Sequence, residues 1–201
     1  MIRLLLLAAV VGLVIYAVVR WRREAREDAL VRARAGFFVT STEPAAARRE
    51  APPLRTVDLG DGRLRFRVPA AWDGEPSPRG ILEARASSSR LRVELCVMEG
   101  GGAADVARLA DALRLSEPGR RGVVEALPGD RVLLKHVRGD AGDSGPEVTY
   151  CWEVWTPLPR GDALVGKFAF CVPAAATGAI TEDDVRLLER EIREAMLTDS
   201  P

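Results

Sequence analysis

The sequence predicts an α+β fold: a mostly antiparallel sheet with a mid-chain and a C-terminal helix, preceded by one transmembrane helix. Three observations lead to this prediction. Apolar and polar residues alternate along 147–173, an uncharged run extends from Leu4 to Val19, and apolar residues recur at helical spacing over 181–197. Alternation with a period of two indicates a half-buried strand, whereas a 3,4 spacing indicates an amphipathic helix.

Residues 1–23 form the predicted transmembrane anchor. The run contains nothing more polar than Gly12 and Tyr16, and its helix is slightly shorter than a hydrocarbon core of about 30 Å. A cleaved secretory signal is the alternative. The apolar region is too long for such a signal, and no small-x-small cleavage pair precedes Arg20. We therefore expect an uncleaved, single-pass anchor in the cell membrane.

The basic residues around the anchor predict its orientation. Arg20, Arg22, Arg23 and Arg26 follow the helix, whereas Arg3 precedes it. The positive-inside rule then places the C-terminal domain in the cytoplasm. The opposite orientation, with a periplasmic or extracellular domain, stays open because a very short amino terminus often remains inside.

Residues 24–53 are predicted to be a charged stalk and linker. Charged residues occur on every side of the helical stretch 20–35, so we prefer a solvated stalk to an extension of the membrane helix into the headgroup zone. Phe37 would contact either the membrane or the domain. Residues 40–53 have the Pro, Ala and charge content of a linker. The sandwich domain is expected to span 54–198.

The first half of the domain reads as two hairpins. In the first, strands 54–59 and 63–68 flank Gly60-Asp61-Gly62, which has the Asp-Gly chemistry of a tight turn. In the second, strands 81–86 and 90–98 flank three serines. Shorter alternating stretches add strands at 123–127 and 131–138.

The segment 147–173 is predicted to be the central hairpin. Trp152, Phe168 and Phe170 fall on one face, which we expect to form a wall of the core. Two registers are open. One pairs Glu153 with Lys167 and leaves Cys151 and Cys171 diagonal; the other places these two thiols side by side. We favour the first because it pairs opposite charges. Two free thiols are then the default, and a disulfide stays open in an oxidising compartment.

Two amphipathic helices complete the domain. Over 103–115 the apolar stripe consists of Val106, Leu109 and Leu113. Over 181–197 it consists of Val185, Leu188, Ile192 and Ala195, with Thr181 as the expected N-cap. The pairs Glu182–Arg186 and Glu189–Arg193 have the i,i+4 spacing of weak ion pairs on the outer face.

Two short motifs resemble the PsbP-like α/β/α sandwich family. Phe66-Arg67-Val68-Pro69-Ala70-Ala71-Trp72 gives a strand, a proline and a tryptophan directly after a hairpin, and Phe170-Cys171-Val172-Pro173 precedes the closing helix. The family includes the extrinsic photosystem II subunit and small bacterial envelope proteins. The resemblance covers about 54–198 and implies a non-catalytic binding or assembly domain. The family's metal sites are not carried over, because this chain has a single histidine and no evident carboxylate cluster.

Composition and motifs exclude several classes of function. A formal net charge of +0 argues against a nucleic-acid-binding protein. The three cysteines lack CxxC spacing, and Gly100-Gly101-Gly102 lacks the lysine of a phosphate-binding loop, so we expect a turn there. His136 is the only histidine, and it alternates with Val132 and Leu134 as a sheet residue would. No catalytic residue, metal or cofactor is therefore predicted, and the chain is expected not to be an enzyme.

The sequence therefore predicts a membrane-anchored, non-catalytic binding or assembly domain that contacts a protein partner at the membrane. The alternative is a small-molecule or lipid-binding module with a cleft between sheet and helix. Trp72, Trp152 and Trp155 are the candidate residues for the ligand or partner surface, since tryptophan combines a large apolar ring with a polar N–H group.

Overall fold

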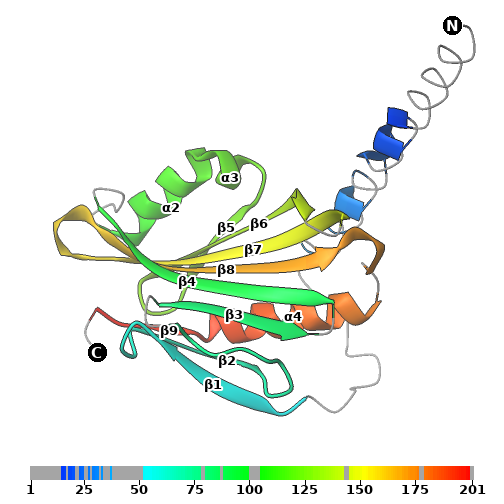
Figure 1. The fold of residues 1–201 in the computed structure, drawn as a ribbon. Helices are drawn as coiled ribbons and strands as arrows, with labels where there is room; N and C mark the ends of the chain where they lie inside the picture. The colour runs from blue at the N-terminus through cyan, green and yellow to red at the C-terminus, as the bar shows by residue number, and fades with distance from the viewer. Residues whose placement is uncertain are drawn as a thin grey trace, which may run out of the picture.

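The computed structural model describes scattered positions between 15 and 37 and residues 52–77, 80–86, 88–99, 105–142, 145–176 and 179–199. The strands of this part of the chain form two sheets rather than the single sheet expected from the sequence (Figure 1). Every pairing between its named strands is antiparallel. The α+β class with mostly antiparallel sheets is thus confirmed.

The larger sheet has six strands in the order β3-β4-β8-β7-β6-β5. Their bounds are β3 Ile81–Ala86, β4 Ser89–Met98, β5 Val123–Leu127, β6 Arg131–Gly142, β7 Gly145–Pro157 and β8 Ala163–Pro173. Glu153 lies opposite Lys167 in the β7–β8 pair, which confirms the favoured register of the central hairpin. The strands with the strongest alternation in the sequence therefore lie in the middle of this sheet.

The smaller sheet has the order β1-β2-β9, with β1 Leu54–Leu59, β2 Leu64–Pro69 and β9 Met196–Leu197. The hairpin of β1 and β2 agrees with the sequence prediction to within one residue. The two-residue strand β9 was expected to be the end of the C-terminal helix. That helix, α4, instead spans Ala179–Arg193 and begins two residues before Thr181, so Thr181 lies inside it and is not its N-cap.

Helices cover the two faces of the larger sheet unequally. Figure 1 shows α2 (Val106–Leu115) and the short α3 (Glu117–Arg120) on one side, and α4 with the smaller sheet on the other. The α4 side holds the main core, which includes Trp152, Phe168 and Phe170 as expected. On the α2 side a second, smaller core is built from Leu109, Ala110 and Leu113 against β6, β7 and β8. We call the main-core side the covered face.

The amino-terminal helical segment contributes to the main core. Ala29, Ala33 and Phe37 recur every four residues, so they lie on one side of a helix, and all three are buried. The expectation of a stalk solvated on every side is therefore wrong for Ala29 and Ala33, whereas Phe37 contacts the domain, one of the two contacts expected for it. These three residues also extend the folded unit to the amino-terminal side of the expected boundary at residue 54.

The predicted anchor lies mainly in a stretch of the chain that is not described, since its residues 1–14 fall there. Among the described residues, none belongs to a helix with the length and apolar character that a membrane crossing requires. The described positions Ile15, Tyr16, Val18 and Val19 are helical, and their side chains are exposed.

Candidate functional site

Lys135 is the centre of the first candidate site. Because side chains alternate along β6, it shares the covered face with Leu133 and Val137, where only 2% of its surface is exposed. An ammonium group is strongly destabilised in such surroundings unless it is paired. Its Nζ atom lies 2.9 Å from Glu189 of α4 and 3.4 Å from Glu125 of β5.

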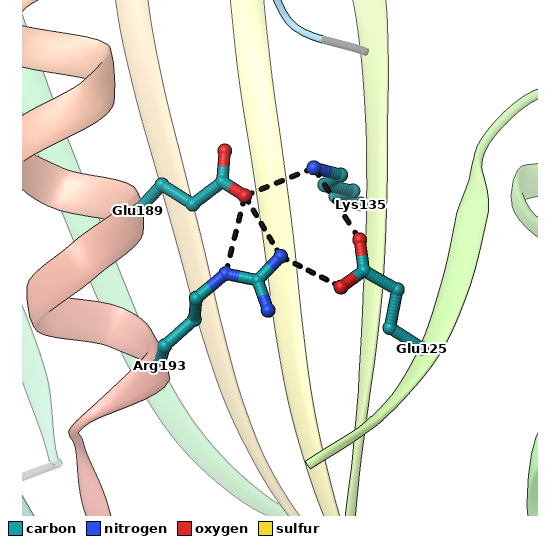
Figure 2. A network of polar contacts seen from close by, with 4 residues as sticks. All are labelled: Glu125, Lys135, Glu189 and Arg193. Carbon is teal, nitrogen blue, oxygen red and sulfur yellow. Dashed lines mark hydrogen bonds and ion pairs between the residues drawn. The ribbon is translucent and has the colours of Figure 1, made fainter. Parts of the chain in front are cut away.

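Arg193 closes these contacts into a network of four charges (Figure 2). Its Nη2 donates hydrogen bonds to Glu125 at 2.7 Å and to Glu189 at 2.9 Å. Each carboxylate therefore faces both cations, and the formal charges of the four groups cancel. The pair Glu189–Arg193, expected as an ordinary outer-face pair, is thus part of a largely buried network that joins β5, β6 and α4.

The electrostatics of the network favour the ionised forms of Glu125 and Arg193. Burial by itself would raise the pKa of Glu125, but the Arg193 hydrogen bond and the positive charges of Lys135 and Arg193 outweigh it, so that the pKa is lowered. Burial would likewise lower the pKa of Arg193, and its bonds to the two glutamates raise it instead. A fully paired network of this kind holds elements together and leaves no group poised to transfer a proton.

Phe37, in the amino-terminal helical segment, packs against the Lys135 side chain of the network. Its ring centroid lies 5.6 Å from Lys135 Nζ, a distance suited to a cation–π contact. The same ring packs against Tyr150 and Trp152, with centroid distances of 5.4 and 5.2 Å. Phe37 therefore connects the amino-terminal segment both to β7 and to Lys135 of the charge network.

The three tryptophans predicted as a ligand or partner surface do not lie together. Trp72 stacks on Phe170 with the ring centroids 5.6 Å apart, and Trp152 is fully buried in the same core. Trp155 points to the opposite face and belongs to the second core, where its Nε1 donates to Glu153 at 3.0 Å. All three are more than nine-tenths buried, so in this structure they contribute to packing.

The second candidate site is the part of the α2 side of the sheet that lies beyond the second core. Its side chains come from β4, β8, β7 and β6, and we call it the open face: Arg92, Glu94, Lys167, Ala169, Glu153, Cys151 and His136. Lys167 lies opposite Glu94 on one neighbouring strand and Glu153 on the other. Burial raises the pKa of Glu153, and the Trp155 N–H bond and the Lys167 charge offset this only in part.

The open face also contains a cysteine–histidine pair, which the sequence analysis missed. Cys151 lies directly opposite His136 in the β6–β7 ladder. The expected strand ended at residue 138, whereas β6 continues to Gly142, which lies opposite Gly145 of β7. Burial raises the pKa of Cys151 to about 12, while burial and the nearby charge of Arg138 lower the pKa of His136. A neutral thiol beside a neutral imidazole is not an activated nucleophile.

The cysteines on this face are not placed for a disulfide. Cys151 lies opposite Ala169, and Cys171 lies opposite Thr149, so the two thiols are diagonal neighbours. Diagonal positions are roughly 7–8 Å apart, beyond the usual Cα separation of a disulfide. All three cysteines are free. No cluster of three or more metal-ligating side chains occurs among the described residues.

No family model matches this chain, and a search of curated proteins finds no match. Among solved structures, a Bacteroides thetaiotaomicron protein matches with 11% identity and a TM-score of 0.46, over 69% of this chain and 46% of that one. The chain thus spans less than half the length of that protein. The solution structure of PsbP from the cyanobacterium Synechocystis matches with 12% identity and a TM-score of 0.34, over 77% of this chain and 98% of that one. A PsbP-like fold, which the sequence resembles, is therefore among the matches. These similarities concern the fold and carry no argument about function.

Proposed function

We propose that this protein is a membrane-anchored, non-catalytic binding domain that contacts a protein partner at the membrane. One observation carries the proposal. Ile15, Tyr16, Val18 and Val19 are helical and exposed, and they continue the uncharged run from Leu4, while the same segment is held in the core by Phe37. In Figure 1 this helix projects away from the sheets. A lipid bilayer is the environment that suits such a helix.

The chemistry of the domain supports binding rather than catalysis. The network around Lys135 is paired and closed, and the thiol of Cys151 and the imidazole of His136 are both held neutral. The open face carries charges of both signs, and its arginine, Arg92, forms an ion pair with Glu83 at 3.7 Å. Such a mixed surface suits a partner that matches it in shape and hydrogen bonding.

The cytoplasm is the proposed location of the domain, because four arginines follow the anchor. The test places a single cysteine by Ala46→Cys in a chain whose native cysteines are replaced. A membrane-impermeant maleimide is then added to intact cells. Labelling only after lysis is expected. Labelling in intact cells would reverse the orientation and direct the search for partners to the outside of the membrane.

The partner itself is tested with a photoreactive amino acid at Ala169, in the middle of the open face. The matched control carries the same group at Asp111 on the exposed side of α2. After irradiation of intact membranes, we expect one discrete heavier adduct from position 169 and none from position 111. The absence of an adduct, or equal adducts from both positions, would contradict the open face as the docking surface.

The second candidate function is the small-molecule-binding module. The three tryptophans belong to the two cores. The observation that favours it is a hollow of about 240 Å³ beside the β1–β2 turn, next to Leu95 and Leu164.

A further inference from the structure

The hollow lies where the β1–β2 turn meets the end of β4. Gly60, Arg63 and Gly80 form one side, and Leu95, Val97 and Leu164 belong to the other. Gly60 has a φ of +59°, and a Cβ atom there would lie 2.6 Å from Leu95 Cδ2. The turn therefore rests directly on Leu95 and needs glycine at this position. The backbone of Gly80 is fixed beside it, because its carbonyl accepts a hydrogen bond from the Leu95 N–H at 3.2 Å.

The side chains from β4 and β8 make one wall of the hollow apolar. Leu164 is fully buried, whereas Val97 is 43% exposed although it is a valine on a sheet. An apolar wall that stays partly open to solvent, beside a small number of polar groups, is typical of a site for a small ligand.

Arg63 supplies the polar group. Its side chain is 30% exposed, and its Nε is buried without a hydrogen-bond partner in the described part of the chain. Its nearest carboxylate, Asp199, lies 3.9 Å from Nη2, beyond hydrogen-bond distance. On β2, which begins at the next residue, Arg65 and Arg67 by contrast each bond a carboxylate at 2.6 Å. A buried guanidinium nitrogen such as this Nε that lacks an acceptor is unusual, because buried polar groups are nearly always hydrogen-bonded.

We propose that this hollow binds a carboxylate attached to a short aliphatic group. The carboxylate accepts hydrogen bonds from the Nη groups of Arg63, and the aliphatic part packs against Leu95, Val97 and Leu164. The pairing of guanidinium with carboxylate is strong and geometrically specific. The hollow, with a volume of about 240 Å³, leaves room for a carboxylate and a few carbons. The proposal deepens the second candidate function and is independent of the first.

Two sources carry this chemistry: a free short-chain carboxylic acid, and the carboxyl-terminal residue of a protein chain with an aliphatic side chain. The probes are therefore 4-methylvalerate and N-acetylglycyl-leucine, each compared with its uncharged amide. Binding to the full chain in detergent is measured by saturation-transfer NMR. We expect the carboxylates to bind with dissociation constants on the order of millimolar, as fits fragments of this size, and the amides to bind at least tenfold more weakly.

Two variants and a control locate the site. Arg63→Met should weaken binding of the carboxylates at least tenfold, and it should not destabilise the fold, because the guanidinium lacks a close partner to lose. Val97→Trp should block the hollow while leaving Arg63 in place. Arg92→Met, an exposed arginine on the open face, should leave binding unchanged.

The possible outcomes distinguish the two sources of the carboxylate. Tighter binding of the peptide by tenfold or more assigns the site to a chain terminus, whereas binding of 4-methylvalerate alone assigns it to a free acid. The proposal would be overturned if the acids and their amides bound equally well, or if no probe bound at saturating concentration. It would also be overturned if the Arg63→Met and Val97→Trp variants both bound the carboxylates as tightly as the parent chain does. None of these results bears on the photocrosslinking from position 169, so the two proposed functions fail independently.

Discussion

Lys135 and Lys167 lie on opposite faces of the same sheet, and each stands between two glutamates. Lys135 is 2% exposed, contacts Glu125 and Glu189, and is sealed by Phe37. Lys167 faces Glu94 and Glu153 across two strand pairs, but it is half-buried on the open face. One lysine and two glutamates thus occur on both faces, but the lysine is buried on the covered face and half-buried on the open face. From this difference we expect that burial, more than the identity of the residues, decides how much each charge contributes to the free energy of unfolding.

The strongest test of this comparison removes each ammonium group in turn. Lys135→Ala leaves two buried carboxylates with one cation, so we expect a loss of about 3–5 kcal/mol in the free energy of unfolding. Lys167→Ala should change it by less than about 1 kcal/mol. Urea denaturation followed by tryptophan fluorescence measures both. Equal losses would mean that burial does not distinguish the two faces.

The covering of Lys135 by the amino-terminal segment is tested by Phe37→Ala. The substitution empties a site between Tyr150 and Trp152, so we expect a loss of about 3 kcal/mol. The matched control on the same segment is Val31→Ala, whose side chain is 67% exposed and should matter by no more than about 0.5 kcal/mol. Denaturation curves that coincide for the two variants would restore the solvated stalk expected from the sequence.

Acid should act with opposite sign on the two faces. The lowered pKa of Glu125 stabilises the fold above the unfolded-state value of about 4.3, and this contribution is lost as pH falls through the folded pKa. The pKa of Glu153 is raised, so the ionised form is disfavoured in the fold and stability is regained as pH falls through the folded pKa.

Glutamine variants separate these two contributions. Near neutral pH, Glu125→Gln should be less stable than the parent chain and Glu153→Gln slightly more stable. Both differences should shrink as pH falls, first for Glu153→Gln, through the raised pKa of Glu153, and then for Glu125→Gln, as pH falls below about 4.3 through the lowered pKa of Glu125. Thermal unfolding across this range measures them, and two differences of the same sign at pH 7 would contradict the contrast.

The smallest effect concerns the thiols of the open face. Cys151 is buried with a pKa of about 12, whereas Cys171 is partly exposed. We expect a maleimide to label Cys171 about tenfold faster than Cys151, since the thiolate is the reactive form. Diamide oxidation of the folded chain should yield no bond between the two. A rapid intramolecular disulfide, detected by mass spectrometry, would mean that the strands can shift register.

The sequence predicted those features that depend on local periodicity. The strands, the stripes of α2 and α4, and the Glu153–Lys167 register all follow from spacing within one element or one hairpin. The division into two sheets did not follow, because the partner of a strand lies far away in the chain. Lys135 was missed for the same reason: its acids come from β5 and α4. Ala29 and Ala33 gave no signal, since alanine is compatible with either a solvated or a packed helix.

The candidate sites were harder to predict than the fold. A tryptophan is a good candidate for either a binding wall or a core, and here the core explains all three. The hollow beside Arg63 depends on how the β1–β2 turn rests on Leu95, a contact between two hairpins that no spacing in the sequence encodes.

The docking of Phe37 also sets an order of events during synthesis. The ribosome makes the amino-terminal helix first, while Tyr150 and Trp152 are added more than a hundred residues later. At about 5–20 residues per second, the interval is roughly five to twenty seconds. Throughout that time Phe37 lacks the rings of Tyr150 and Trp152 against which it packs. If that helix enters a bilayer, it does so before the domain exists, and the domain then folds onto a helix that is already fixed in place.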